Sequence, residues 1–136
     1  MAWRKVTDIE AWNLSMKLAK EFDAILDRPP ACNDRKFCEE AREAADSVPR
    51  NIAEGFGRYG DREFARFVEI GYGSLLETYT NLVRAGNRRF MSGPETERLM
   101  PLYEETKATT LGLLKSLKRR IAEEERERPR RKNSRT

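Results

Sequence analysis

The chain has 136 residues, of which 38% are hydrophobic and 37% charged, and its net charge is +4. This length allows one domain with a single core, and the balance of apolar and charged residues is typical of helical bundles with large polar faces. The sequence has no run of about 18 apolar residues, which excludes a membrane-spanning helix. The N-terminal residues lack the apolar core of a signal peptide, so we expect a cytoplasmic protein.

The sequence contains no histidine. It therefore lacks the commonest general base and any Ser-His or Cys-His pair, so we expect no enzyme, no catalytic residues and no cofactor. Acid–base chemistry by Asp or Glu stays open, but no spacing indicates it. Di-iron bundles use Glu-x-x-His pairs, so we expect no metal site. The two cysteines, Cys32 and Cys38, are too few for zinc and are expected to remain reduced.

Four stretches have the apolar periodicity of amphipathic helices. The predicted helices cover residues 8–27, 33–57, 62–88 and 94–125. Asp8, the pair Asn33-Asp34 and Asp61 are the expected N-caps of the first three helices, and Pro94 suits the first turn of the fourth. Pro49 interrupts the second helix without shifting its apolar phase, which predicts a kink rather than two helices.

Four helices joined by short loops predict an all-α fold, an antiparallel up-down-up-down four-helix bundle over residues 1–125. The segment 126–136 is highly charged and broken by proline. We therefore predict that it forms a disordered basic C-terminal tail.

The first and third predicted helices carry more apolar surface than one bundle core needs. Each has a second apolar face beside its main stripe, whereas the fourth helix has one stripe. We expect these second faces to contact other copies of the chain in a homo-oligomer. The candidate interface residues are Leu14, Leu18 and Ile25 in the first helix, and Tyr72, Leu76, Tyr79 and Val83 in the third.

The basic excess lies at the C-terminus. Residues 118–136 contain nine Lys and Arg against four Glu, so the rest of the chain is close to neutral. Repeated in an oligomer, such a tail could hold phosphates through many weak contacts, although a purely solubilising tail is an equal alternative. The candidate nucleic-acid-binding residues are Arg88 and Arg89 in the third loop, and Lys118, Arg119, Arg126, Arg128, Arg130, Arg131, Lys132 and Arg135.

Four polar residues of the second helix share one face, because they are spaced at i, i+4, i+7 and i+11. They border the apolar stripe, and Ser74 and Glu77 of the third helix are their expected partners. One interpretation is a polar binding strip. The favoured one is a half-buried structural seam that fixes helix register. The helix-two residues of this seam are Ser47, Asn51, Glu54 and Arg58.

The run from Ser47 to Arg58, Ser-Val-Pro-Arg-Asn-Ile-Ala-Glu-Gly-Phe-Gly-Arg, resembles the signature of the bacterial 23S rRNA intervening-sequence protein family. The resemblance extends to Glu63, Phe64 and Phe67, to the Gly73-Ser74-Leu75 run, and to the Trp12 helix. It implies a left-handed four-helix bundle that assembles into a ring, often a pentamer, and it implies no enzyme. A related protein, the accessory variability protein of diversity-generating retroelements, binds a reverse transcriptase and nucleic acid.

Two functions follow as hypotheses. The first is a non-enzymatic homo-oligomer, expected to be pentameric, that binds RNA, DNA or a nucleic-acid-processing partner such as a reverse transcriptase. The alternative is a protein-interaction scaffold with no nucleic-acid role, which the near-neutral body favours.

Overall fold

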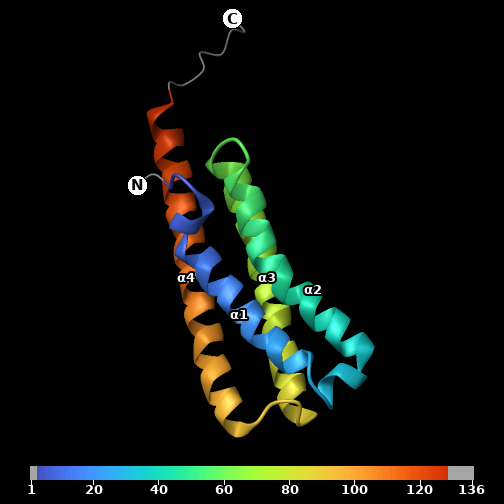
Figure 1. Cartoon of the computed structure of the whole chain (residues 1–136). Helices are drawn as coiled ribbons and strands as arrows, with labels where there is room; N and C mark the ends of the chain where they lie inside the picture. The colour runs from blue at the N-terminus through green and yellow to red at the C-terminus, as the bar shows by residue number, and fades with distance from the viewer. Residues whose placement is uncertain (1–2, 129–136) are drawn as a thin grey trace, which may run out of the picture.

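The computed structural model describes residues 3–128, and this part of the chain contains helices and no strands. Four long helices lie side by side, with the α2–α3 turn at one end and the other two connections at the opposite end (Figure 1). Their bounds are α1 (Glu10–Leu26), α2 (Arg35–Phe56), α3 (Asp61–Asn87) and α4 (Gly93–Glu127), with short 3-10 helices η1 (Val6–Asp8) and η2 (Ala31–Asn33). These bounds agree with the four predicted helices to within a few residues.

Local signals determine where two of the helices begin. The carboxylate of Asp34 accepts a hydrogen bond from the backbone N–H of Phe37 at 3.2 Å, which confirms it as the cap of α2. Ser92 and Glu95 form a capping box at the start of α4. The helix α2 continues through Pro49, and its ribbon changes direction near the middle (Figure 1).

Two predicted caps are wrong. Asp8 lies in η1, where its carboxylate accepts the backbone N–H groups of Arg4 and Lys5, and α1 starts two residues later. Asp61 is already the first residue of α3, because Gly60 makes the turn with a φ of 85°. Its carboxylate instead lies 3.1 Å from Arg120 of α4.

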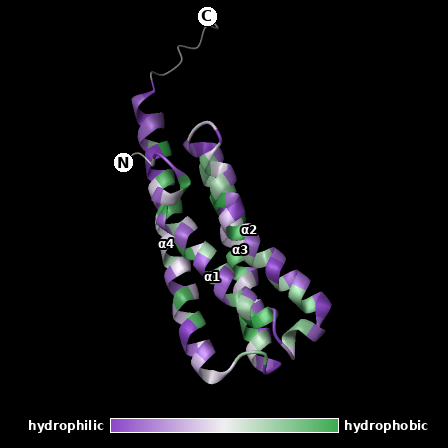
Figure 2. Ribbon diagram, viewed as in Figure 1, coloured by the Kyte–Doolittle hydropathy of each residue, from purple (hydrophilic) through white to green (hydrophobic). Residues whose placement is uncertain are grey.

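The C-terminal boundary also differs from the prediction. The helix α4 ends at Glu127, so Arg126 and Glu127 are helical and do not belong to a disordered tail. Arg128 follows the helix end in an extended conformation, and the other predicted tail residues, 129–136, lie outside the described residues. Figure 2 shows the last turns of α4 as a hydrophilic segment at the same end of the molecule as the α2–α3 turn.

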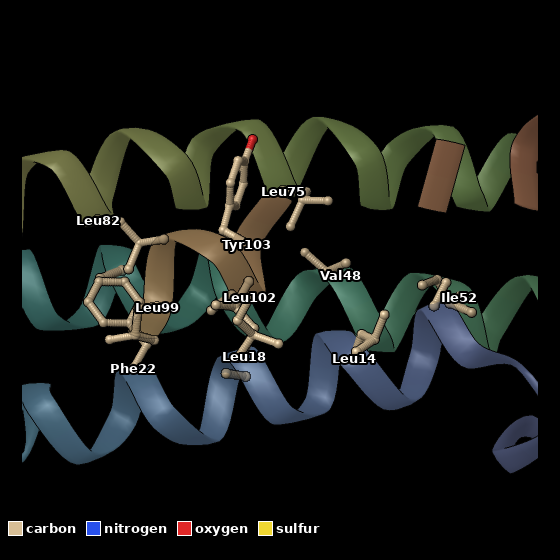
Figure 3. Packing of buried hydrophobic residues seen from close by; sticks show 14 of the residues in the cluster. Leu14, Leu18, Phe22, Val48, Ile52, Leu75, Leu82, Leu99, Leu102 and Tyr103 are labelled. Carbon is tan, nitrogen blue, oxygen red and sulfur yellow. The ribbon is translucent and has the colours of Figure 1, made fainter. Parts of the chain in front are cut away.

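The core is a continuous layer of apolar side chains between the four helices, and Figure 3 shows its central part. Leu14, Leu18 and Ile25 lie inside it with 8%, 2% and 0% of their surfaces exposed. The prediction that they form an oligomer interface is therefore wrong. A bundle helix packs between two neighbours, so α1 needs a wide apolar face. Met16, by contrast, is a large apolar residue of α1 that is 45% exposed.

Glycine allows α2 and α3 to approach each other closely. A methyl group added at Gly55 would lie 2.7 Å from Cβ of Phe67, and one added at Gly71 would lie 3.3 Å from the carbonyl oxygen of Val48. Gly71 thus lets α2 and α3 come close to each other within one chain. At Gly73 an added methyl group would meet nothing within 4 Å, so that glycine serves no contact inside the protomer.

Within residues 3–128, no helix combines the length and the apolar character that crossing a bilayer requires.

Candidate functional site

The predicted polar seam exists in part. The Ser47 and Ser74 hydroxyls lie 2.7 Å apart across the α2–α3 contact, and the Asn51 amide donates to the Ser47 hydroxyl at 2.9 Å and to the Ser47 carbonyl at 2.8 Å. Ser47 is buried, so these bonds satisfy polar atoms that water does not reach freely. This geometry supports the structural interpretation for Ser47, Asn51 and Ser74.

The other three predicted seam residues are at the surface. Glu54 and Arg58 form an ion pair at 2.7 Å with about half of each side chain exposed. The Arg58 guanidinium also lies 5.2 Å from the ring centroid of Phe67. Glu77 is exposed and makes no hydrogen bond or ion pair with the other described residues, so it does not join the seam.

The two loop arginines differ. Arg88 forms an ion pair with Asp34 at 2.6 Å, and its guanidinium lies 4.8 Å from the ring centroid of Phe37. It therefore ties the end of α3 to the start of α2. Arg89 adopts a positive φ of 61° after the helix end and is exposed. Its side chain forms no ion pair within the part of the chain that the structure describes.

The C-terminal half of α4 carries a row of basic side chains. Lys118 lies 3.6 Å from Glu69 of α3, so its charge is balanced within the protomer. Arg119, Arg126 and Arg128 are exposed and form no ion pair among residues 3–128. Lys115, which is not among the predicted binding residues, is also exposed and unpaired within those bounds.

Helical spacing places three of these residues together. Lys115, Arg119 and Arg126 follow one another at i, i+4 and i+11, so they lie on one face of α4. We call these three residues the α4 basic face. Lys115 was not predicted because it is separated in the sequence from the charged cluster near the C-terminus. Its four-residue spacing to Arg119 is nevertheless visible in the sequence.

A second exposed surface lies where α3 meets α4. Leu76 and Tyr79 have 48% and 43% of their surfaces exposed. The ring of Tyr79 packs 5.1 Å from that of Tyr103, which is buried in the core. Burial raises the pKa of Tyr103 to about 12, so its hydroxyl stays neutral at physiological pH. We call this surface the α3/α4 apolar face; its half-buried and exposed members are Tyr72, Leu76, Tyr79, Val83, Leu111 and Leu114.

The described residues offer little to catalysis. Among residues 3–128, no group of three His, Cys, Asp or Glu side chains is placed to hold a metal ion. Cys32 and Cys38 are both free thiols, and burial raises the pKa of Cys38, which disfavours its reactive thiolate. The strongest pKa shift of an acid is that of Glu95, lowered to about 2 by hydrogen bonds from Arg28 and Ser92. The Glu95 carboxylate therefore takes part in a helix cap and an ion pair.

Comparison with known protein families shows the family to which the chain belongs. The model of the 23S rRNA-intervening sequence protein family matches residues 7–112. The chain therefore belongs to this family, as the run from Ser47 to Arg58 predicted. No curated protein matches the sequence closely enough to count as a relative. The match ends before all three residues of the α4 basic face, Lys115, Arg119 and Arg126.

Proposed function

We propose that this protein is a non-enzymatic, cytoplasmic homo-oligomer that binds nucleic acid through the α4 basic face and the residues that follow it. The observation that carries the proposal is the row Lys115, Arg119 and Arg126, none of which forms an ion pair within residues 3–128. Elsewhere most arginines are paired within the protomer. Unpaired cations on one face are free to replace the counterions of a phosphate backbone.

The C-terminal residues extend this surface in sequence. Four more basic residues, Arg130, Arg131, Lys132 and Arg135, follow α4 without an intervening acid. Arg88 and Lys118 are held by Asp34 and Glu69. That Arg88 and Lys118 bind nucleic acid stays a prediction. These two paired residues support the proposal less than the unpaired residues do.

The proposed oligomer forms through the α3/α4 apolar face. Leu76 and Tyr79 are large apolar groups left in water, and tyrosine is enriched at the centre of protein interfaces. Family membership favours an antiparallel, left-handed bundle that forms a pentameric ring. In such a ring each copy presents one basic face, so weak phosphate contacts add through effective concentration.

Binding should be measured by fluorescence anisotropy with labelled single-stranded DNA and RNA over a range of salt. Replacing Lys115, Arg119 and Arg126 by Gln should weaken binding roughly tenfold and lower the slope of log affinity against log salt by about 2. The matched control replaces Lys17, Lys20 and Lys36, which are exposed and unpaired within residues 3–128 on α1 and α2. Equal loss in both variants, or no binding by the native protein at low salt, would refute the proposal.

Assembly has a separate test. Leu76→Lys places a charge in the α3/α4 apolar face and should reduce the mass measured by light scattering while leaving the helical circular dichroism unchanged. Met16→Lys is the control, because Met16 is similarly exposed but lies on α1. A native protein that is monomeric at micromolar concentration would rule the oligomer out.

A protein-interaction scaffold is the second candidate. The exposed apolar side chains of α3 and α4, together with the near-neutral charge of the rest of the chain, favour it. The partner could be a reverse transcriptase or another nucleic-acid-processing enzyme. Co-purification of a protein partner with the native chain, lost in Leu76→Lys and kept in the variant of the α4 basic face, would support this candidate over the first.

A further inference from the structure

Tyr59 lies at the tip of the turn between α2 and α3, and its side chain is fully exposed at 101%. The turn is held by backbone bonds from Gly57 N–H to the Ala53 carbonyl and from Arg58 N–H to the Gly55 carbonyl, so it needs nothing from the Tyr59 ring. A large aromatic side chain that buries no surface gains nothing for folding. Its flat ring is open to a ligand.

The surroundings of Tyr59 combine positive charge with a depression in the surface. Arg62 and Arg128 line this depression together with Tyr59. Arg62 is paired with Glu125, and Arg128 forms no ion pair among residues 3–128. In the sequence, Arg128 is followed by four more basic residues between positions 130 and 135.

The acidic residues of the depression are largely balanced. Asp61 is paired with Arg120 at 3.1 Å, and Glu125 is paired with Arg62. Glu124 has no ion pair within the described part of the chain. A negatively charged ligand would therefore be opposed mainly by Glu124, and this opposition can be removed by substitution.

We propose that Tyr59 is a stacking platform for an unpaired base of single-stranded nucleic acid, with Arg128 holding the adjacent phosphate. This inference rests on the proposed nucleic-acid function and specifies its ligand. Aromatic rings stack on bases of any sequence, and neighbouring cations track the backbone, which is the usual chemistry of single-strand recognition. A base within a duplex is covered by its neighbours, so the platform selects single strands.

The test compares an oligothymidylate with an abasic oligonucleotide of the same length and charge, and with a duplex. Tyr59→Ala should weaken binding of the oligothymidylate roughly tenfold. It should leave the salt slope and the binding of the abasic strand and the duplex unchanged. Tyr59→Phe is the control and should bind like the native protein, because stacking needs the ring and not the hydroxyl.

The outcomes separate this inference from the function on which it rests. Native protein that binds no nucleic acid contradicts both. Native protein that binds, while Tyr59→Ala binds the oligothymidylate equally well, contradicts the stacking platform alone. An equal loss on the abasic strand would also overturn it, since that strand has no bases to stack. Retained nucleic-acid binding together with loss of a co-purifying protein in Tyr59→Ala would assign the ring to a protein contact instead.

A charge change provides an independent check. Glu124→Gln removes the unbalanced acid of the depression and should strengthen single-strand binding about twofold to fivefold at low salt. Glu105→Gln is the matched control, because Glu105 is an exposed acid elsewhere on α4 without an ion pair in residues 3–128. Identical affinity of the two variants would contradict the placement of a phosphate beside Arg128.

Discussion

Polar side chains are arranged in opposite ways in the α2–α3 contact and in the C-terminal half of α4. Between α2 and α3, the hydroxyls of Ser47 and Ser74 and the amide of Asn51 bond to one another, and Gly55 and Gly71 bring the helices close. At the end of α4, Lys115 and Arg119 have no such partners within residues 3–128. The residues that identify the family therefore build the fold, and the groups left free to bind a ligand lie elsewhere.

The largest expected effect comes from removing the close approach. Gly55→Ala would place a methyl group 2.7 Å from Cβ of Phe67, so the helices must separate. We expect a loss of about 2 kcal/mol in the free energy of unfolding, measured with urea. In the control Gly112→Ala, the added methyl group would meet nothing within 4 Å. The free energy of unfolding of this variant should therefore rise by about 0.5–1 kcal/mol. Equal stability of the two variants would show that α2 and α3 are not in tight contact.

A smaller loss should follow from opening the polar seam. Ser47→Ala removes the buried hydroxyl that contacts both the Ser74 hydroxyl and the Asn51 amide, while the Asn51 amide keeps its bond to the Ser47 carbonyl, and we expect a cost of about 1 kcal/mol. A double-mutant cycle with Ser74→Ala measures the coupling directly, and the double variant should be less damaged than the sum of the two single ones. Strict additivity would mean that the 2.7 Å contact contributes nothing to stability.

Arg88 and Arg89 test the difference between paired and unpaired charge at adjacent positions. Arg88→Ala removes the ion pair with Asp34 and the contact with Phe37. We expect this to lower the free energy of unfolding, measured by thermal unfolding, by about 1 kcal/mol. Arg89→Gly should gain about 1 kcal/mol, because a residue with a φ of 61° is strained unless it is glycine. If both variants lost stability, Arg89 would have a structural partner as well.

The smallest effect concerns the start of α4, where charge is paired. The pKa of Glu95 falls from 4.5 to about 2 beside Arg28, so its stabilising contribution is complete above pH 4.5 and disappears as pH falls towards 2. Glu95→Gln should lose about 0.5 kcal/mol at neutral pH, since the pair lies near the surface, and the deficit should shrink in acid. Glu97→Gln, without an ion pair in residues 3–128, should show no such trend. A deficit independent of pH would contradict this assignment.

The sequence predicted those features that depend on nearby residues. Asp34 caps α2 because its partner, Phe37, is three residues away. Asp8 does not cap α1 because it lies in the 3-10 helix η1, and Asp61 does not cap α3 because Gly60 takes the positive φ before it. Boundaries of this kind depend on loop geometry, which periodicity does not describe.

The face that each helix turns towards the core was harder to predict. A single stripe does not cover the whole core surface of α1, because that helix packs between two neighbours, so Leu14 and Leu18 lie in the core and not at an interface. Lys115 could have been found from its spacing to Arg119. The exposure of Tyr59 could not, since a tyrosine in a glycine-flanked turn can equally well fold back onto the bundle.

The central claim is that the family motif builds the bundle and the end of α4 binds nucleic acid. The most direct measurement is the anisotropy titration of a single-stranded oligonucleotide with two variants, Ser47→Ala and the Gln replacement of Lys115, Arg119 and Arg126. We predict that Ser47→Ala keeps the native affinity and salt slope although it is less stable, and that the α4 variant binds roughly tenfold more weakly with a salt slope lower by about 2. Loss of binding in a folded Ser47→Ala protein, with native binding by the α4 variant, would contradict the claim.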